Sequence, residues 1–225
     1  MADSIRVCVF DAYGTLFDVH SAVARHASLL GPDAAAISRL WRSKQIEYSW
    51  IHSLMRKHVD FWVLTRRALD YALAFHGIRD DEIARNLLDS YLELEAYAEV
   101  PAMLKSLREA GIRTAILSNG SRFMLDRAVD AAGIGKLLDA TLSIDDAGIY
   151  KPDPAAYRLV ERSFDVTAKQ MAFFSSNAWD AAGAGSFGFR VFWVNRLGQP
   201  EEYGLRASAT ELQSLAEVVG LMTPN

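Results

Sequence analysis

An apolar run near the N-terminus ends in an aspartate, the first side chain in this sequence that could do chemistry. Residues 5–15 read Ile-Arg-Val-Cys-Val-Phe-Asp-Ala-Tyr-Gly-Thr, so Asp11 follows the run and Thr15 offers a hydroxyl nearby. A continuous apolar run is typical of a strand buried on both faces of a parallel sheet. A carboxylate at the end of such a strand lies where open α/β sheets bind ligands. Asp11 is therefore a candidate nucleophile, and the alternative is an acid that only opens a turn.

Three further segments combine an apolar run with a polar end. They read Arg-Thr-Ala-Ile-Leu-Ser-Asn-Gly at 113–120, Ile-Tyr-Lys-Pro-Asp-Pro at 149–154 and Met-Ala-Phe-Phe-Ser-Ser-Asn-Ala-Trp-Asp at 171–180. With the Asp11 segment, they resemble the four motifs of the haloacid dehalogenase superfamily. In that superfamily the first aspartate is a covalent nucleophile, a Ser or Thr follows the second strand, a Lys precedes the helix of the third motif, and acids follow the fourth strand.

Two positions depart from the pattern of the superfamily's phosphatases. Tyr13 stands where those enzymes carry a second aspartate as general acid/base, and a phenol with a reference pKa of about 10 is a poor proton shuttle at neutral pH. Ser176 stands where their fourth motif has a carboxylate for magnesium, a cation that favours charged oxygen ligands. We therefore expect neither a metal nor another cofactor, and these two residues disfavour a phosphatase.

The complete pattern resembles the L-2-haloacid dehalogenase branch of the superfamily. The segment 40–50, Leu-Trp-Arg-Ser-Lys-Gln-Ile-Glu-Tyr-Ser-Trp, matches that branch as well as the four motifs do. The resemblance implies hydrolysis of L-2-haloacids to D-2-hydroxy acids and halide through an ester on Asp11. A more distant alternative is a non-catalytic small-molecule binding protein of the same fold. It is disfavoured because Asp11, Ser118, Lys151 and Asp180 are all present.

The resemblance also implies roles for individual side chains. Arg42 would receive the departing halide, which suits a weakly hydrated guanidinium among aromatic residues, although a lone helical arginine is more often solvated. Lys151 would favour the ionised form of Asp11. Asp180 would hold the hydrolytic water together with Asn177, and the alternative for Asp180 is a helix N-cap. The implied catalytic residues are Asp11, Thr15, Arg42, Lys151, Tyr157, Ser175, Asn177 and Asp180.

Substrate binding is implied for a partly overlapping set. Ala12 and Tyr13 would contribute backbone N–H groups to the substrate carboxylate, and Ser118 its hydroxyl. For Tyr157 and Ser175 a purely structural role is the alternative. The implied substrate-binding residues are Ala12, Tyr13, Arg42, Phe61, Ser118, Asn119, Asn177 and Trp179.

The elements that must position these residues change character along the chain. Helices are expected at 19–30, 34–57 after the cap Asp33, 61–76 and 81–95, with no β-rich run between them. Strands near 112–117, 140–144, 171–175 and 190–194 then alternate with helices. The expected fold class is α/β, a doubly wound parallel sheet with a Rossmann-like core and a helical cap domain inserted after the first strand. Residues 1–17 and 99–225 would form the core, and 18–98 a cap that excludes water from the strand ends.

Composition limits the setting of the protein. A formal charge of −4 and a pI near 5.7 give no basic field, so no nucleic-acid partner is expected. Cys8, the only cysteine, is expected to be a small buried hydrophobe. With no disulfide possible, no apolar leader and no run near ~18 apolar residues, we expect a cytoplasmic protein that does not bind membranes. The resemblance implies a 2-haloacid and halide as ligands and a homodimer formed through the cap.

Overall fold

A single parallel sheet forms the centre of the computed structural model, which describes residues 5–222. Within these residues the sheet has six strands in the order β3-β2-β1-β4-β5-β6, and every neighbouring pair is parallel. Their bounds are β1 (Val7–Phe10), β2 (Arg113–Ser118), β3 (Ala140–Ser143), β4 (Met171–Ser175), β5 (Arg190–Val194) and β6 (Ala209–Leu212). The buried strand β1 lies near the centre of the sheet. Asp11, which follows it, therefore lies near the middle of the edge formed by the strand ends.

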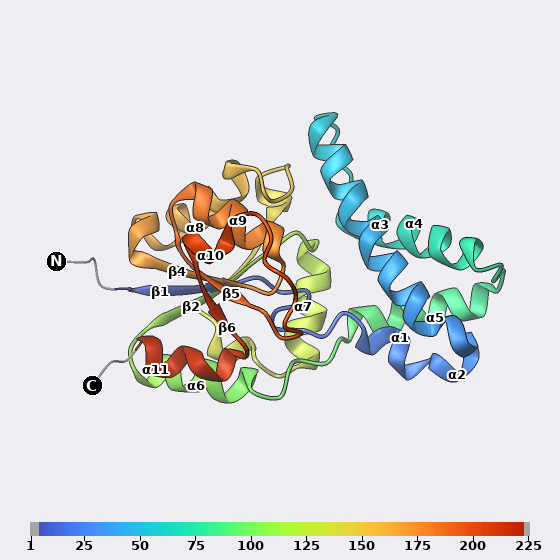
Figure 1. Ribbon diagram of the computed structural model, residues 1–225, viewed down its shortest axis with the longest axis horizontal. Coiled ribbons are helices and arrows are strands. Elements are labelled where there is room, and N and C mark those ends of the chain that lie inside the picture. The colour runs from blue at the N-terminus through green and yellow to red at the C-terminus, as the bar shows by residue number, and fades with distance from the viewer. Residues whose placement is uncertain (1–4, 223–225) are drawn as a thin grey trace.

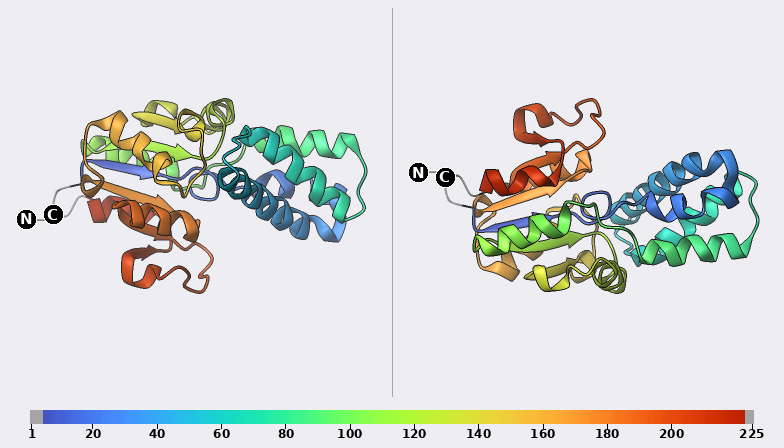
Figure 2. Two further views of the ribbon diagram at one scale, coloured as in Figure 1. Left: turned by 90° about the horizontal axis from the view of Figure 1, so that it is seen from above. Right: turned by 90° about the horizontal axis from the view of Figure 1, so that it is seen from below.

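Helices cover both faces of the sheet because both sets of alternating strand side chains are apolar. Cys8 and Phe10 pack with α6 (Val100–Glu109), α7 (Arg122–Ala131) and α11 (Val218–Met222). Val7 and Val9 pack on the opposite face with α8 (Pro154–Phe164), α9 (Ala178–Phe187) and α10 (Leu205–Ser208). Figure 2 shows these two helical layers from above and below. The sheet is therefore doubly wound, as predicted.

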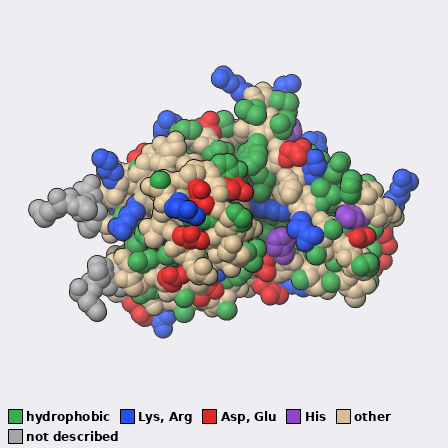
Figure 3. Space-filling view, viewed as in Figure 1, with side chains coloured by type: hydrophobic (Ala, Val, Ile, Leu, Met, Phe, Trp, Pro, Cys, Tyr) green, Lys and Arg blue, Asp and Glu red, His purple; other side chains and the backbone are tan. Residues whose placement is uncertain are grey.

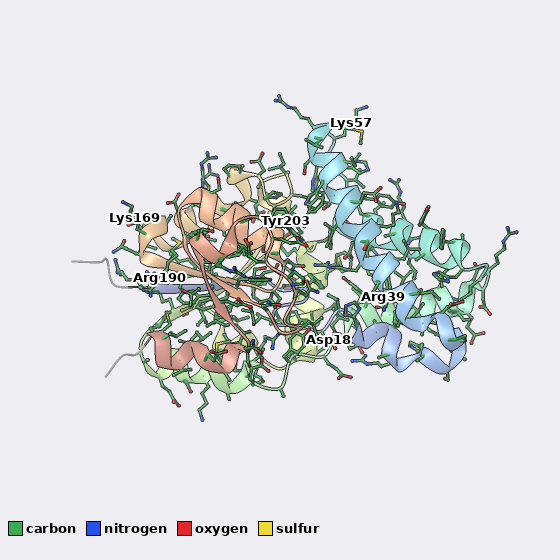
Figure 4. The ribbon with its side chains drawn as sticks, in the orientation of Figure 1. Asp18, Arg39, Lys57, Lys169, Arg190 and Tyr203 are labelled. Atoms are coloured by element: carbon green, nitrogen blue, oxygen red, sulfur yellow. The ribbon has the colours of Figure 1, made fainter. Side chains whose placement is uncertain are left out.

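A group of helices lies beyond one end of the sheet, away from both termini (Figure 1). Asp60 and Asp80 cap two of these helices, each accepting hydrogen bonds from two backbone N–H groups. The long α3 packs on α4, and its far end projects past the core, where Figure 4 places Lys57. The helices are α1 (Ser21–Arg25), α2 (Ala27–Leu30), α3 (Ala34–Leu54), α4 (Phe61–Phe75) and α5 (Asp81–Leu92).

Two chain segments that lie side by side join these helices to the sheet. Phe17 forms an antiparallel bridge with Ala96, and the Asp18 N–H donates to the Glu95 carbonyl at 2.8 Å. Asp18 lies at this junction in Figure 4. The helical insertion after β1 therefore leaves and re-enters the core through one paired connection.

The predicted fold class is confirmed, while several predicted element bounds are wrong. The helix expected at 19–30 is broken at His26, whose φ of −113° and ψ of 16° are not helical. The helix expected at 34–57 ends at Leu54, and Asp33 makes no side-chain capping bond. The helix expected at 81–95 ends at Leu92. The strand β6 was missed because only Leu212 of its four residues is buried, so it has no apolar run.

The domain bounds stay a prediction. They assign residues 1–17 and 99–225 to the core and residues 18–98 to the cap. Residues 1–4 and 223–225 of the proposed core lie outside the described residues. None of the helices within 5–222 is long and apolar enough to cross a membrane.

Candidate active site

The carboxyl ends of three neighbouring strands bring the predicted site residues together. Asp11 follows β1, Ser118 ends β2 and Ser175 ends β4. The chain fills one side of β1 with β2 and β3 and then the other with β4 to β6, so the strand order reverses beside β1. Crevices at such reversals are the usual ligand sites of doubly wound sheets.

Asp11 is 5 % exposed, and both oxygens of its carboxylate accept hydrogen bonds. Oδ1 accepts one hydrogen bond, from Lys151 Nζ at 3.0 Å. Oδ2 accepts three, from Thr15 Oγ1 at 3.0 Å, Asn177 Nδ2 at 2.7 Å and Ser175 Oγ at 3.4 Å. The unequal distribution leaves Oδ1 with more free lone-pair capacity than Oδ2.

A buried ion pair lies behind Asp11. Lys151 Nζ bonds both Asp11 and Asp180 Oδ2, the latter at 2.8 Å, and the side chains of Lys151 and Asp180 are fully buried. Burial by itself would lower the pKa of Lys151, but the two carboxylates outweigh it, so this pKa lies above its usual value. The lysine therefore stays charged at any physiological pH.

Asp180 has the opposite balance. Burial raises its pKa to about 6, against the opposing effect of the Lys151 ammonium, and the charge of Asp11 adds to the rise. Tyr157 donates its hydroxyl to Asp180 Oδ1 at 2.8 Å, and burial raises the pKa of this phenol far above its ordinary value. Asp180 is thus a carboxylate at neutral pH, with a donor on each oxygen.

The alternative interpretation of Asp180 as a helix N-cap is wrong. The N-cap of α9 is Asn177, and Asp180 is the third residue of that helix. Its carboxylate faces the Lys151–Tyr157 pair instead of backbone N–H groups.

The cavity above Asp11 is closed by side chains from both parts of the molecule. Its volume is about 10 Å³, which is room for roughly one water molecule. The described conformation is therefore closed, and a substrate must displace part of the lining. The lining residues are Asp11, Tyr13, Arg42, Ile46, Phe61, Ser118, Asn119 and Trp179.

Arg42 reaches this cavity from α3. Its Nη2 donates to the Tyr13 carbonyl at 3.1 Å and to Asn177 Oδ1 at 3.5 Å, and its Nη1 to Gln45 Oε1 at 2.7 Å. The alternative of a solvated surface arginine is therefore wrong. Gln45 was missed by the sequence analysis. It is fully buried and also bonds Tyr91 and Thr65, and its spacing of three residues from Arg42 on a helix was the available signal.

The proposed carboxylate-binding groups belong to or adjoin the same lining. Ser118 Oγ accepts a hydrogen bond from the Gly120 N–H at 3.0 Å and still has a proton to donate. Among residues 5–222, the backbone N–H groups of Ala12 and Tyr13 donate to no protein acceptor. Asn119 Oδ1 accepts from the Lys151 N–H at 2.9 Å, so this side chain also fixes the lysine loop.

Aromatic rings complete the cavity. The Tyr13 ring lies 6.3 Å from Phe61 and stacks on Tyr91 at 5.7 Å. Burial raises the pKa of the Tyr13 phenol well above 10, so it does not exchange protons at neutral pH. A Cβ at Gly120 would lie 2.6 Å from the Tyr13 ring, which explains the glycine there. Trp179 meets Trp50 of α3 edge to face, with centroids 5.5 Å apart.

The part of the chain that the structure describes contains no cluster of three or more His, Cys, Asp or Glu side chains that could hold a metal ion. The Ser176 hydroxyl, at the position of the phosphatase carboxylate, has no hydrogen-bond partner.

Known proteins of similar sequence agree with the interpretation of these motifs. The sequence profile of the haloacid dehalogenase-like hydrolases matches residues 5–188. The chain belongs to this family. Among its members, the chain is 46 % identical to (S)-2-haloacid dehalogenase 1 of Pseudomonas sp. (strain CBS-3), over 98 % of this chain and 97 % of that protein.

Solved structures of this family superpose closely. A crystal structure of a dehalogenase with an intermediate complex gives a TM-score of 0.97 at 45 % identity and covers 100 % of both chains. The L-2-haloacid dehalogenase from Xanthobacter autotrophicus with chloropropionic acid covalently bound gives a TM-score of 0.89 at 35 % identity. It covers 96 % of this chain and 98 % of that one. The superfamily predicted from the motifs is thereby confirmed.

Proposed function

We propose that this haloacid dehalogenase-like hydrolase converts L-2-haloacids to D-2-hydroxy acids and halide through an ester on Asp11. The observation that carries the proposal is a buried aspartate, paired with Lys151, at the base of a cavity that Arg42 closes. The 46 % identity to an (S)-2-haloacid dehalogenase and the likeness to a structure with chloropropionic acid covalently bound support it.

In the first step, Asp11 displaces the halide. Oδ1 is the attacking oxygen because it accepts one hydrogen bond where Oδ2 accepts three. A bond forms between Oδ1 and the substrate α-carbon, and the carbon–halogen bond breaks with its electron pair leaving on the halide. Back-side displacement inverts the carbon, so an L-2-haloacid gives a D-2-hydroxy acid.

Two groups of residues would orient the substrate for this attack. Arg42 receives the halide beside the rings of Phe61 and Trp179, where a weakly hydrated guanidinium suits a large anion. The Ser118 hydroxyl and the free N–H groups at positions 12 and 13 bind the substrate carboxylate, and Asn119 lines the same side. The substrate carboxylate and the departing halide would thus be bound by different groups of the site.

In the second step, water attacks Cγ of the Asp11 ester. Asp180, ionised at neutral pH, accepts the water proton, and Asn177 holds the water with it. Negative charge develops on Oδ2, where the donors on Thr15, Ser175 and Asn177 are already in place. The Cγ–Oδ1 bond then breaks, and the departing oxygen takes up the proton that Asp180 accepted. The hydroxy acid leaves with the original Oδ1 oxygen, the water oxygen stays on Asp11, and the second water proton passes to solvent as the Asp11 carboxylate re-forms.

Isotope labelling tests the covalent step. After a single turnover in H₂¹⁸O with enzyme in excess, mass spectrometry of the peptide containing residues 10–15 should show a gain of about two daltons on Asp11. D-lactate formed from L-2-chloropropionate in that turnover should carry no label. Label found only in the lactate hydroxyl would mean that water displaces the halide directly, with Asp11 as a general base.

A phosphatase of the same fold is the nearer alternative, and a non-catalytic binding protein the farther. We propose that neither a metal nor another cofactor takes part, since Ser176 and Tyr13 replace the phosphatase carboxylates. Halide release from L-2-chloropropionate should survive EDTA treatment. Hydrolysis of p-nitrophenyl phosphate with magnesium and no halide release would support the phosphatase, and inactivity in both assays the binding protein.

We also propose a cytoplasmic homodimer formed through the helices α1–α5. Exposed aromatic side chains on α4 support the choice of surface: Tyr71 and Phe75 stack 6.3 Å apart and are 42 % and 68 % exposed. Light scattering should give twice the mass of the 25.0 kDa chain.

A further inference from the structure

The closed cavity has a larger hollow next to it, between α3 and the loop that carries Lys151. This groove has a volume of about 460 Å³. Figure 3 shows hydrophobic side chains gathered where α3 meets the core. We define the tail groove by its lining residues, which are Trp50, Ser53, Leu54, Ile149, Tyr150, Lys151, Pro152 and Asp153.

Two indole rings in contact lie between the tail groove and the catalytic cavity. Trp179 lines the cavity, Trp50 lines the groove, and the two rings meet edge to face at 5.5 Å with an interplanar angle of 85°. Lys151 belongs to the groove lining, while its ammonium bonds Asp11. The lining of the groove therefore includes a residue that is hydrogen-bonded to the nucleophile.

The spacing along α3 places residues of the cavity and of the groove on one face of this helix. Ile46, Trp50 and Leu54 recur every four residues, so they lie on one face of the helix. Ile46 lines the cavity, while Trp50 and Leu54 line the groove. An alkyl chain that passed the Trp50 position would continue along this apolar stripe.

The Trp50 side chain makes no hydrogen bond. Its indole Nε1 is buried without a hydrogen-bond partner, so packing alone positions the ring. Arg42 and Ser118 of the cavity lining, by contrast, are each fixed by hydrogen bonds. Since the closed cavity admits about one water molecule, some part of its wall must yield to a substrate.

From these observations we propose that Trp50 sets the chain-length limit for 2-haloacids, and that the tail groove takes the alkyl chain of longer substrates when the Trp50 ring is removed. The proposal rests on the proposed function of the same site. The occupant is an unbranched alkyl chain because Leu54, Ile149 and Pro152 give the groove an apolar lining. The two charged residues of the lining have partners elsewhere, since the Lys151 ammonium bonds the buried carboxylates and the Asp153 carboxylate caps α8. Each methylene seated there contributes about a fourfold gain in binding.

The test measures kcat/KM for L-2-bromopropionate, L-2-bromohexanoate and L-2-bromooctanoate. Wild-type activity should fall as the chain lengthens. Trp50→Ala should raise the ratio of octanoate to propionate activity at least tenfold. If the chain-length profile of Trp50→Ala equals that of the wild type, the proposal is wrong. Should Trp50→Ala fail to fold by circular dichroism, Trp50→Leu provides the same comparison with more of the apolar packing retained.

A second pair of variants shows whether the tail uses the groove or only a larger cavity. Leu54→Asp, added to Trp50→Ala, should remove the gain for octanoate because it replaces an apolar wall by a carboxylate that, unlike Asp153, caps no helix. Ile51→Asp is the matched control, since Ile51 is an exposed α3 residue that lines neither hollow. The proposal is overturned if Leu54→Asp leaves the gain intact, or if Ile51→Asp removes it equally.

Wild-type turnover of L-2-bromopropionate separates this inference from the function on which it rests. If the wild type releases no bromide from any of the three acids, the proposed function itself fails. If it releases bromide from propionate and the variants leave the profile unchanged, only the role of Trp50 and the tail groove is refuted.

Discussion

At the scale of single residues, the chemistry depends on how the hydrogen bonds of Asp11 are divided. Three donors on Oδ2 and one on Oδ1 give the two oxygens different roles in the proposed mechanism. The same three donors would stabilise charge on Oδ2 in the second step without any rearrangement, which is the property of a preorganised oxyanion site.

Replacing the nucleophile by its amide should abolish turnover while preserving the fold. Asp11→Asn has nearly the same volume, but an amide is a far weaker nucleophile, and we expect a loss of at least about a thousandfold in kcat. Circular dichroism should match the wild type. Steady turnover by a protein whose mass still corresponds to Asn at position 11 would show that Asp11 is not the nucleophile.

The pKa of Asp180 predicts the acid limb of the rate. Burial raises this pKa to about 6, so below that pH the carboxyl is protonated and cannot accept the proton of the water. Single-turnover hydrolysis of the ester should therefore rise with pH through about 6 and stay level above it. Lys151, with its pKa raised above 10.5, adds no upper limb below that value.

A variant of Tyr157 tests the assignment of that limb. The Tyr157 hydroxyl donates to Asp180 and stabilises its ionised form, so Tyr157→Phe should move the limb to higher pH by about one unit or more. An acid limb that stays in place in Tyr157→Phe would assign it to another group.

At the scale of elements, three helices meet at one buried glutamine. Gln45 of α3 accepts hydrogen bonds from Arg42 and from Tyr91 of α5, and donates to Thr65 of α4 at 2.7 Å. The guanidinium proposed to receive the halide is therefore aimed by a helix packing arrangement that its own sequence neighbourhood does not reveal.

Removing this amide should affect both stability and halide departure. Gln45→Met keeps the length of the side chain but leaves buried donors unpaired, which should lower the free energy of unfolding by roughly 1–3 kcal/mol. The loss in kcat/KM should be larger for 2-chloropropionate than for 2-bromopropionate, because the poorer leaving group needs Arg42 more. Arg39→Met, at an exposed position nearly two turns earlier on α3, is the control. Equal losses for both halides would mean that Gln45 acts on the fold alone.

At the scale of the whole molecule, one hydrophobic cluster spans the sheet and the helical insertion. It contains Phe10 and Phe174 of the sheet together with Phe61, Leu64 and Tyr91 of the helices α4 and α5. Because apolar contact continues across the paired connection at Phe17 and Ala96, neither part can unfold without exposing apolar surface of the other.

We therefore expect the insertion and the core to unfold together. Scanning calorimetry should show one endotherm, with the same midpoint as the loss of helical circular dichroism. Two resolved transitions, the first accompanied by most of the loss of helical signal, would show that the helices α1–α5 melt on their own.

The sequence determined the fold class and most of the candidate site because their signals are local. An apolar strand that ends in Asp11, and the polar ends of the later strands, can be recognised one segment at a time, and parallel strands bring such ends to the same edge. The alternation of strands and helices after position 100 is equally local. The edge strand β6 was missed because a half-exposed strand carries no such signal.

Tertiary structure alone decided which of these groups touch. Lys151 and Asp180 are 29 residues apart, and nothing in either segment shows that one ammonium joins Asp180 to Asp11. Gln45 and Trp50 look like ordinary residues of an amphipathic helix, yet packing sets one against Arg42 and the other against Trp179 of the cavity lining. Such roles arise from packing between segments distant in sequence, where burial and the neighbouring charge set what a side chain can do.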